Sequence, residues 1–567
     1  MKYLRVFLVF SLCLLGCAPL GAAAADNPAM KTECINVAEN KPITSNAEHN
    51  PIWPLTNLVD GNRMTFVPAE YQPGALADSS NEEIVIDLQR RYRIERIEIC
   101  NRVDVAQTSG RSGFDLIGAN HEDFSDAVRL GGIAAGPDDD SLFPLKGAYT
   151  LQLDGAAAYR YIKFARTAAG YYGYGEFKVF AEQTATEVAK GKTATANYWY
   201  EFMDAFAPSK ANNGTNANDG DCWIAEAATV PNYYYWRVDL GEPMHIGMIE
   251  MEGRNFAPAG LEDNPITRKY NDVYGSNTNL DDTVLGQNAE LVGMGDYKRL
   301  IKITENEAYE GEQQFPGVTN ASNREMFQST VDDTEAFQYL TFKKSYLSFA
   351  ALGAFRAYVI NPEVNGSSLD GREITVDFSD KMDASYLTED HVQVYVNGTL
   401  TEAEVSCPDD YTMKLTLPEI YYSSRVRVQL AQEIKNQKNV PLAKAYTLNF
   451  STPPAVDVTE FKLQDAKSGE GSEVASLSGL TQLGAKVVMK NNMTDQPETA
   501  VILMVLCDSN NTVIKIDEKR LSIAPGATAE EVAGFDLPAQ TAGCRASVFV
   551  WRDYNLMEPW ITHVTID

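Results

Sequence analysis

The sequence is short of the residues that most catalytic and nucleic-acid-binding sites use. It has five histidines in 567 residues, with no H-E-x-x-H pair, and no G-x-S-x-G, P-loop or dinucleotide motif in a convincing context. Its 48 basic residues are outnumbered by 78 acidic ones, and the net charge of −30 repels phosphate backbones. With so many carboxylates some pair is inevitable, so no glycosidase-like pair can be selected. We therefore expect a non-catalytic protein that does not bind nucleic acid.

Cysteine is also scarce, and its spacing excludes several kinds of site. Outside the first 25 residues there are six, with no C-x-x-C pair: Cys34, Cys100, Cys222, Cys407, Cys507 and Cys544. This excludes a zinc ribbon, a thioredoxin motif and a disulfide-rich scaffold. Only Cys507 and Cys544, which fall in one predicted domain, are plausible disulfide partners. The others are expected to be buried free thiols.

Long apolar runs are absent beyond the N-terminus, which has the features of an export signal. Lys2 and Arg5 precede an apolar stretch at residues 6–15 that is too short to span a bilayer. Ala23-Ala24-Ala25 suits cleavage after residue 25, giving a secreted protein. Leu14-Leu15-Gly16-Cys17 instead resembles a lipobox, which would anchor Cys17 at the cell surface through lipid. We favour secretion and keep the lipoprotein as the alternative.

An internal repeat is the most informative feature that is present. Six segments recur in one order with longer spacing in the second copy, which indicates two homologous domains near residues 30–183 and 184–360. These are called the first copy and the second copy below. Matched pairs include Asn36-Val37-Ala38 with Glu187-Val188-Ala189, Ile86-Asp87-Leu88 with Val238-Asp239-Leu240, and Tyr161-Ile162-Lys163-Phe164 with Tyr339-Leu340-Thr341-Phe342.

Short strands separated by Gly, Asn and Asp predict an all-β chain. Residues 84–88 and 94–99 have β-branched residues between charged ones, which indicates antiparallel sandwiches. Past residue 360 the pattern changes to cleaner alternation, with an Asn397-Gly398 hairpin signal. We expect one immunoglobulin-like sandwich at 361–453, a linker at Pro453-Pro454, and a last β-sandwich at 455–567.

The first copy resembles the discoidin family, also called the coagulation factor V/VIII type C fold. The resemblance is carried by Val59-Asp60-Gly61-Asn62 with Thr65, Asn101-Arg102, and Gly175-Glu176-Phe177. It implies two discoidin-type jelly-roll sandwiches, followed by two Ig-like sandwiches. Bacterial members are largely carbohydrate-binding modules, and F-type lectins are close relatives. Residues 361–453 resemble a bacterial Ig-like domain, and 455–567 a C-terminal sandwich of secreted carbohydrate-active proteins, ending in Val550-Trp551 and Asn555-Leu556-Met557.

The resemblance implies a structural calcium ion in the first copy, held by Asp60, Asn62, Thr65 and Glu176. Calcium takes six to eight oxygens from carboxylates, carbonyls and hydroxyls, and these residues offer them. The alternative is that Asp-Gly-Asn is a simple turn that binds no metal. The second copy departs from the pattern, because Asp219-Gly220-Asp221 runs directly into Cys222 and Ala354 stands where Glu176 should be. No calcium site is predicted there.

The resemblance places the glycan site on loops after the third matched strand, at Asn101, Arg102, Asp104 and Arg111. Arg102-x-Asp104 fits an element of the F-type lectin motif, but the motif's upstream His is missing between Thr65 and Glu83. Fucose specificity is therefore not predicted. Arg102 and Asp104 could equally form a surface ion pair of little energetic value.

Aromatic clusters provide a second candidate contact surface. They are Tyr171-Tyr172-Gly173-Tyr174 in the first copy, and Tyr198-Trp199-Tyr200 and Tyr233-Tyr234-Tyr235 in the second. Such side chains either bind ligands or fill sandwich cores, and we expect about half to be buried. We count Tyr171 and Tyr172 as binding residues.

The sequence thus predicts an extracellular, non-catalytic protein that binds a glycan or polysaccharide, with a neutral sugar favoured by the acidic charge. The alternatives are a surface adhesin or scaffold for a protein partner, and an accessory part of a polysaccharide-degrading system. A membrane contact is expected only through the lipid at Cys17.

Overall fold

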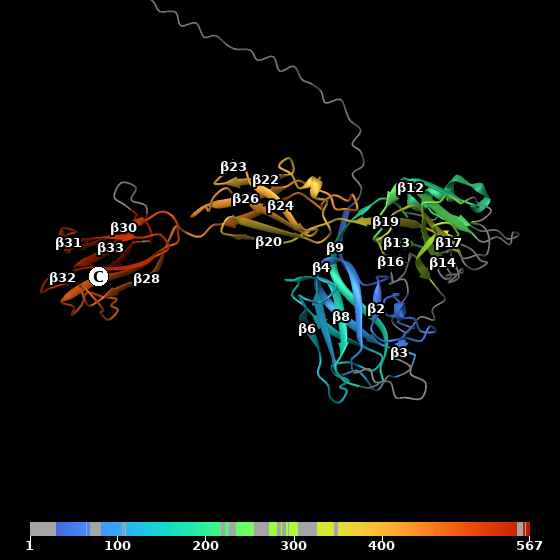
Figure 1. Ribbon diagram of the computed structural model, residues 1–567, viewed down its shortest axis with the longest axis horizontal. Helices are drawn as coiled ribbons and strands as arrows, with labels where there is room; N and C mark the ends of the chain where they lie inside the picture. Colours follow the sequence, from blue (N-terminus) through green and yellow to red (C-terminus); the bar gives the residue numbers. More distant parts are fainter. Residues whose placement is uncertain are drawn as a thin grey trace, which may run out of the picture. The chain divides into compact units, whose positions relative to one another are not determined.

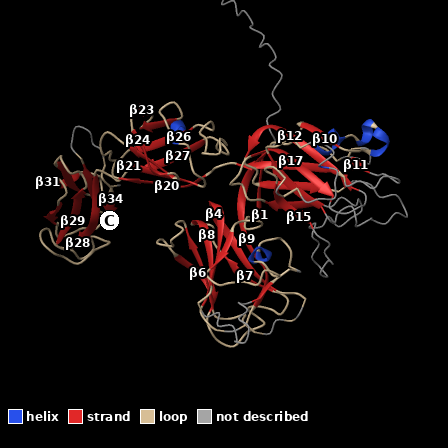
Figure 2. Ribbon diagram, turned by 45° about the vertical axis from the view of Figure 1, so that its right-hand side comes forward, coloured by secondary structure: helices blue, strands red, loops and turns tan. Residues whose placement is uncertain are grey.

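The computed structural model describes residues 30–567 apart from 64, 69–80, 105, 107–108, 170, 217–220, 226–233, 254–270, 281–284, 286–290, 293, 304–325, 345–349, 553–558 and 562. The predicted leader and Cys17 therefore lie outside the described residues. Strands connected by loops and a few short 3-10 turns make up the described residues, so the predicted all-β fold class is confirmed (Figures 1 and 2). None of the helices within the described ranges is long and apolar enough to cross a membrane.

The first copy is a sandwich whose sheets share one long strand. Its elements are β1 (Met30–Asn36), β2 (Ile43–Ser45), η1 (Leu55–Leu58), β3 (Val67–Pro68), β4 (Glu83–Asn101), β5 (Phe114–Ala119), β6 (Val128–Ile133), β7 (Ala148–Gln152), β8 (Ala158–Arg166) and β9 (Gly173–Glu187). The first part of β4 pairs with β2 and β8, and its last part pairs with β7 and β9.

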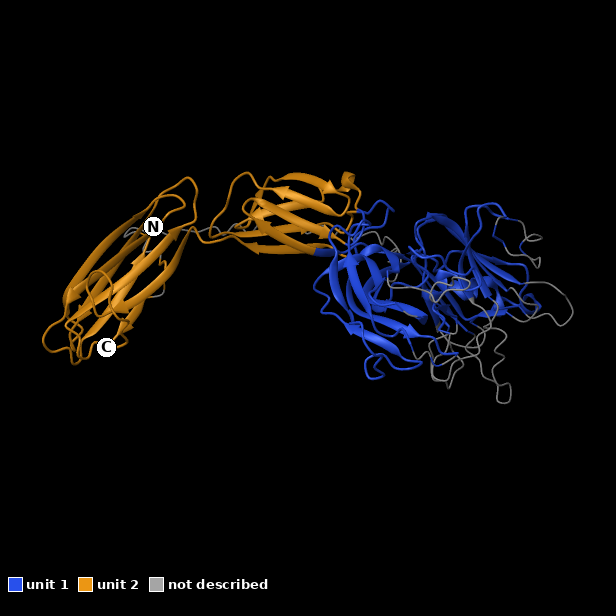
Figure 3. Cartoon of the chain, turned by 60° about the horizontal axis from the view of Figure 1, so that its bottom comes forward, with its two compact units in different colours: residues 1–365, 379–381, 435–443 blue, residues 366–378, 382–434, 444–567 orange. Residues whose placement is uncertain are grey.

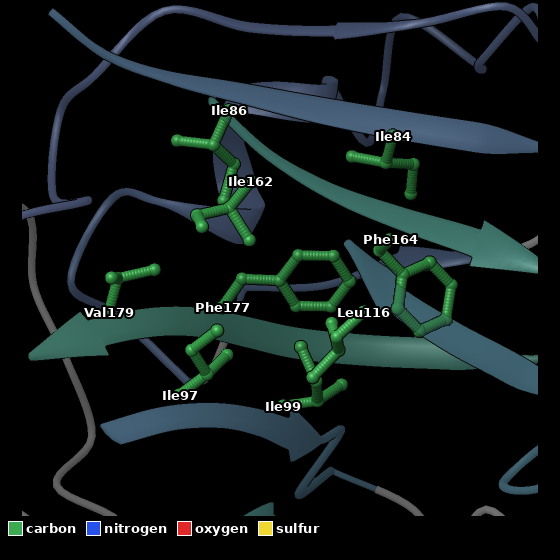
Figure 4. A pocket seen from close by; sticks show the side chains of 9 residues that line it. All are labelled: Ile84, Ile86, Ile97, Ile99, Leu116, Ile162, Phe164, Phe177 and Val179. Atoms are coloured by element: carbon green, nitrogen blue, oxygen red, sulfur yellow. The ribbon is translucent and has the colours of Figure 1, made fainter. Parts of the chain in front are cut away.

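The two strands predicted at 84–88 and 94–99 are thus two halves of β4. The pairing register shifts between Asp87 and Tyr92, and Gln89 has a positive φ of 67°. Figure 4 shows the result, with Ile84 and Ile86 of one half lining the same apolar core as Ile97 and Ile99 of the other. The alternation of the sequence buries these residues, and both ends of β4 lie at the same end of the sandwich.

The second copy repeats the strand order of the first. Its 5-stranded sheet runs β10-β12-β17-β14-β15, which matches the order β2-β4-β8-β5-β6 of the first copy. Its elements are β10 (Thr193–Ala196), η2 (Tyr200–Phe202), η3 (Asp204–Phe206), η4 (Pro208–Asn212), β11 (Trp223–Ala225), β12 (Tyr235–Met244), β13 (Met248–Glu252), β14 (Asn271–Ser276), β15 (Lys298–Ile303), β16 (Met326–Thr330), β17 (Phe337–Lys344), β18 (Ala350–Leu352) and β19 (Ala354–Ile360).

The two copies are joined by a continuous sheet. Strand β9 extends past the first sandwich, and its end pairs with β19 from Tyr358↔Glu187 to Ile360↔Ala185. Met248, Tyr358 and Ile360 of the second copy belong to the buried core of the first. Because hydrogen bonds and apolar packing both cross the seam, the copies form a single compact unit.

The chain consists of two compact units (Figure 3). Unit 1 holds both copies with residues 361–365, 379–381 and 435–443, and unit 2 holds 366–378, 382–434 and 444–567. The strands after residue 360 are β20 (Val364–Asp370), β21 (Glu373–Phe378), β22 (Val392–Val396), β23 (Thr399–Thr401), β24 (Glu404–Asp409), β25 (Thr412–Thr416), β26 (Arg425–Leu430), β27 (Tyr446–Ser451), β28 (Val456–Gln464), β29 (Gln482–Asn491), β30 (Glu498–Cys507), β31 (Val513–Ile523), β32 (Thr528–Asp536), β33 (Arg545–Trp551) and β34 (Val564–Ile566), with η6 (Ala384–Tyr386).

These later strands form paired sheets of three or four strands. The orders are β20-β21-β25-β24 with β23-β22-β26-β27, then β28-β29-β32 with β31-β30-β33-β34. The predicted Asn-Gly hairpin is present between β22 and β23, where Asn397 and Gly398 have φ values of 50° and 85°. Cys507 and Cys544 are both free thiols, so the disulfide considered between them is not formed. The predicted motif at 555–557 lies outside the described residues.

Candidate functional site

One end of the first copy brings together both groups of predicted site residues. The two ends of β4 meet there, with the loops that precede β3, β5 and β9. Phe66 comes just before β3, Arg102 just after β4, and Tyr171 just before β9. Residues far apart in sequence therefore meet because three strands begin or end at one place.

Arg102 is the centre of an aromatic and ionic cluster at this end. Its guanidinium carbon lies 3.6 Å from the centre of the Phe66 ring, and Trp53 stacks on Phe66 at 5.6 Å. Arg102 donates from Nε and Nη2 to the two carboxylate oxygens of Asp104 at 2.8 and 2.6 Å, and Nη1 reaches Tyr171 Oη at 3.5 Å. We call Trp53, Phe66, Arg102, Asp104 and Tyr171 the platform.

The platform combines exposed ring surface with planar polar groups. The Tyr171 residue is 45% exposed, the Asp104 side chain is 35% exposed, and Trp53 and Phe66 are partly exposed. Bidentate pairing with Asp104 raises the pKa of Arg102 above its usual range. A charged fork held beside aromatic rings suits a ligand with hydroxyls on one edge and C–H groups on a face.

Buried groups beneath the platform hold its loops in place. Arg166, 4% exposed, donates from Nη1 to the carbonyls of Gly110 and Ser112 at 3.0 and 2.9 Å. Tyr174 Oη also donates to the Gly110 carbonyl, at 2.8 Å. Gly110 has φ +76°, and a Cβ there would lie 2.3 Å from the Tyr171 carbonyl, so only glycine allows this close approach.

Three of the predicted sugar-binding residues lie inside the domain and are not part of the platform. Asn101 is fully buried, and its side chain accepts the Arg102 amide at 3.1 Å. Arg111 is 4% exposed, donating to the Phe143 carbonyl and pairing with Asp140 at 2.7 Å. Tyr172 is fully buried and stacks on Tyr174 at 4.7 Å. They support the loops from inside: Asn101 ends β4, whereas Arg111 and Tyr172 lie in loops whose tertiary packing turns them inward.

Trp53 and Phe66 were not predicted from the sequence. Trp53 lies in the loop after β2, and no local sequence pattern indicates that it stacks on Phe66. Phe66 directly follows Thr65 of the predicted metal loop. This adjacency is a signal for Phe66 in the sequence, because a loop held in place at Thr65 also fixes the position of the next residue.

The predicted metal residues converge beside the platform. Thr65 Oγ1 donates to the Asn62 carbonyl at 2.6 Å and lies 3.0 and 2.9 Å from the two Asp60 carboxylate oxygens. The Asn62 amide donates to Asp60 Oδ1 at 2.9 Å. Glu176 arrives from β9, and its Oε1 accepts the Gly61 amide at 3.1 Å. The Asp-Gly-Asn turn and the last strand are thus tied together as the resemblance implied.

Burial dominates the electrostatics of this loop, and the neighbouring Lys178 offsets it only in part for Glu39 and Glu176. Burial raises the pKa of Asp60 to about 7, with a further contribution from the neighbouring Glu39. Burial also raises the pKa of Glu39 to about 7, while a hydrogen bond from Ser329 acts in the opposite direction. For Glu176, burial and the Asp60 carboxylate raise the pKa well above its usual range. Three carboxyl groups that resist ionisation together indicate a place for a cation.

The donor set fits a calcium ion. Glu176 is fully buried, and its Oε2 has no hydrogen-bond partner. A buried carboxylate oxygen without a partner is costly unless a ligand satisfies it. Within the described ranges, no group of three or more His, Cys, Asp or Glu side chains forms a metal cage. The oxygens here come instead from the Asp60 and Glu176 carboxylates, the Asn62 carbonyl and the Thr65 hydroxyl, a mixture typical of calcium.

The second copy does not reproduce this arrangement. Ala354 is buried at the position of Glu176, and Asp221 accepts hydrogen bonds from Asn213 and Thr215; residues 219 and 220 lie outside the described part. Its aromatic clusters are split: Tyr234 and Tyr235 are buried, Tyr198, Trp199 and Tyr200 are partly exposed, and Tyr233 lies outside the described residues.

No family model matches the chain, and no curated protein matches it in sequence. Among solved structures, the chain is similar to a fucolectin from striped bass (Morone saxatilis) serum, with 15% identity, TM-score 0.22, and coverage of 58% of this chain and 100% of that one. It is similar to a Clostridium perfringens carbohydrate-binding module in complex with GlcNAc-α-1,4-galactose, at 16% identity, TM-score 0.21, and 26% and 95% coverage. A third is a carbohydrate-binding module from Clostridium thermocellum Xyl5A, with 20% identity, TM-score 0.21, and coverage of 25% of this chain and 95% of that one.

Proposed function

We propose that this protein is an exported, non-catalytic carbohydrate-binding protein, and that the platform of the first copy is its sugar-contacting surface. The observation that carries the proposal is the pairing of Arg102 with Asp104 beside the Phe66 ring and the exposed Tyr171. Arg and Asp in a fixed fork supply donors and acceptors for adjacent hydroxyls, while the rings accept the C–H face of a sugar.

The charge of the chain favours a neutral sugar over an acidic one. The net charge is −30, and Arg102 is already neutralised by Asp104. An anionic polysaccharide would meet repulsion from a chain of this net charge, and the guanidinium of the platform is already paired. A small set of polar groups around two or three rings also favours a sugar over a protein, which needs a broader apolar patch.

Calcium is proposed as a structural ion beside the platform. Asp60, Asn62, Thr65 and Glu176 would hold it, and the ion would add positive charge beside carboxyl groups that Lys178 compensates only in part. These residues tie the loop before β3 to β9, so they fix the position of Phe66 next to Thr65. The metal loop thereby supports the platform without touching the sugar.

Export is proposed from the leader alone, with cleavage after residue 25 favoured and a lipid anchor at Cys17 as the alternative. The later sandwiches would act as spacers or docking modules. In this role the protein would retain a glycan at the cell surface or outside the cell, or serve as an accessory part of a polysaccharide-degrading system.

A glycan array probed with the full chain lacking residues 1–25 tests the proposal. Binding to one or more neutral glycans in calcium is the expected result. Binding to no glycan, together with specific capture of one protein partner, would overturn the proposal in favour of an adhesin or scaffold.

A further inference from the structure

Strand β16 of the second copy contacts the loop between β1 and β2 of the first copy, which lies against the metal loop. Ser329, 1% exposed, donates from Oγ to Glu39 Oε1 at 2.7 Å and accepts from Asn40 Nδ2 at 2.7 Å. Thr330 Oγ1 donates to the Glu39 carbonyl at 2.6 Å, and the Thr330 carbonyl accepts from Asn40 Nδ2 at 3.1 Å. Both the side chain and the main chain of Glu39 are therefore held by the other copy.

Glu39 in turn lies against the centre of the metal loop. Gly61 has φ +78°, and a Cβ built there would lie 2.7 Å from Glu39 Oε1. The Gly61 amide faces Glu176, to which it donates at 3.1 Å. The Gly61 backbone is thus in contact with one carboxylate from the loop before β2 and one from β9.

This geometry makes Glu39 an electrostatic neighbour of both proposed carboxylate ligands, Asp60 and Glu176. Among these three carboxylates, Glu176 alone has a buried oxygen without a hydrogen-bond partner, whereas Glu39 Oε1 accepts from the Ser329 hydroxyl. Glu39 is therefore assigned as a positioning group next to the ion site, held from the second copy, with Asp60 and Glu176 as the carboxylate ligands. Groups of this kind orient ligands and tune affinity from outside the coordination sphere.

We propose that the second copy completes the calcium site of the first, because Ser329 and Thr330 fix Glu39 against the metal loop. Cation binding and docking of the two copies then stabilise each other. The inference rests on the proposed calcium site. It gives the second copy, which lacks its own equivalent of Glu176, a role in holding the sugar-binding end of the first. Thermodynamic linkage requires the effect to be reciprocal.

The seam offers a matched control. Gln328, the residue before Ser329, donates to Glu33 and, at 3.1 Å, to Glu250, and these contacts do not involve Glu39. A Gln328→Ala variant therefore weakens the seam without touching the metal loop. Ser329→Ala and Thr330→Val remove the two hydroxyls that hold Glu39 and leave the chain's apolar packing nearly unchanged.

Calorimetric titration of calcium into the full chain tests the proposal. We expect Ser329→Ala and Thr330→Val each to raise the calcium Kd by roughly tenfold, and Gln328→Ala to leave it unchanged. Calcium should also slow amide hydrogen exchange in β16 of the wild-type chain, and less so in Ser329→Ala. Melting of the metal-free variants confirms that they are folded.

Two results would overturn the inference, and they have different meanings. If the wild-type chain binds no calcium, the proposed ion itself is wrong and the coupling falls with it. If the wild-type chain and all three variants bind calcium equally, and exchange in β16 does not respond, the ion stands and only the coupling is wrong.

Discussion

The Arg102 guanidinium carbon lies 3.6 Å from the centre of the Phe66 ring, while the same guanidinium pairs with Asp104 through two hydrogen bonds. The aromatic contact and the fork restrict Arg102 to one orientation. A rigid polar group of this kind loses little entropy when a ligand binds, which is the property that a shallow sugar site needs. The fixed position of Arg102 between Phe66 and Asp104 is therefore the basis for the predictions about sugar binding.

The neighbouring residues Tyr171 and Tyr172 should behave in opposite ways. Tyr171→Ala should leave stability within about 0.5 kcal/mol, because the side chain is exposed, and should abolish or strongly weaken sugar binding. Tyr172→Ala should cost about 3–5 kcal/mol, because it removes a buried ring that stacks on Tyr174. Urea denaturation with sugar titration separates the two effects. Equal destabilisation by both variants would contradict the placement of Tyr171.

Calcium should raise the melting temperature of the full chain, and Glu176→Gln should remove this response. Glutamine keeps the shape and the hydrogen bond from Gly61, but it loses the charge that the ion requires. Differential scanning calorimetry in calcium and in EDTA measures the shift. Asp115→Asn, which alters an exposed ion pair with Arg129 away from the loop, should respond to calcium as the wild type does. An undiminished response in Glu176→Gln would contradict the ligand assignment.

Metal-free stability should fall as the pH rises from 5 to 8. The folded-state pKa values of Glu39 and Asp60 are about 7, above the usual values near 4 in an unfolded chain. Stability from their neutral forms is therefore fully present below about pH 4 and is lost as the pH rises through about 7. Calcium needs the ionised carboxylates, so it should stabilise more at pH 8 than at pH 5.

Asp60→Asn isolates this effect from the other acidic groups of the chain. In EDTA the wild type should lose stability relative to Asp60→Asn between pH 5 and pH 8, because asparagine has no proton to lose. The measurement is the difference between the two melting temperatures at each pH. A difference that is constant with pH would show that Asp60 does not titrate in this window.

Arg90 should be essential for the seam between the copies. It is 2% exposed and pairs with Asp333 of the second copy and with Asp380, both within unit 1. Arg90→Met should cost about 3–5 kcal/mol, because the two buried carboxylates lose the guanidinium that they share and keep Lys438 and Asn436 as side-chain partners. The control Arg129→Met breaks an exposed pair with Asp115 and should cost no more than about 0.5 kcal/mol. Urea denaturation compares them, and similar midpoints would refute the role of Arg90.

Much of the fold was predictable because alternation and turn residues act locally. The halves of β4, the Asn397-Gly398 turn and the convergence of Asp60, Thr65 and Glu176 follow from such patterns or from the resemblance. The bend at Gln89 was not predictable, since its positive φ depends on the fold around it and not on its own side chain.

The membership of the site was harder to predict than its location. Arg102, Asp104 and Tyr171, predicted as parts of two separate surfaces, lie together, but Asn101 and Tyr172, one residue away from two of them, face inward. Whether a loop residue is buried depends on tertiary packing, which cannot be read from the local sequence. For the same reason, the contact of Ser329 with Glu39, 290 positions away, had no local signal.

The most direct measurement of the central claim is a glycan array probed with the wild-type chain and with Arg102→Met. Methionine keeps much of the apolar stem but removes the guanidinium that pairs with Asp104 and lies over Phe66. We predict that the wild type binds neutral glycans and that the variant, folded and with an unchanged response to calcium, loses every one of those signals. A wild type that binds no glycan, or a variant that binds the same glycans with the same strength, would contradict this prediction.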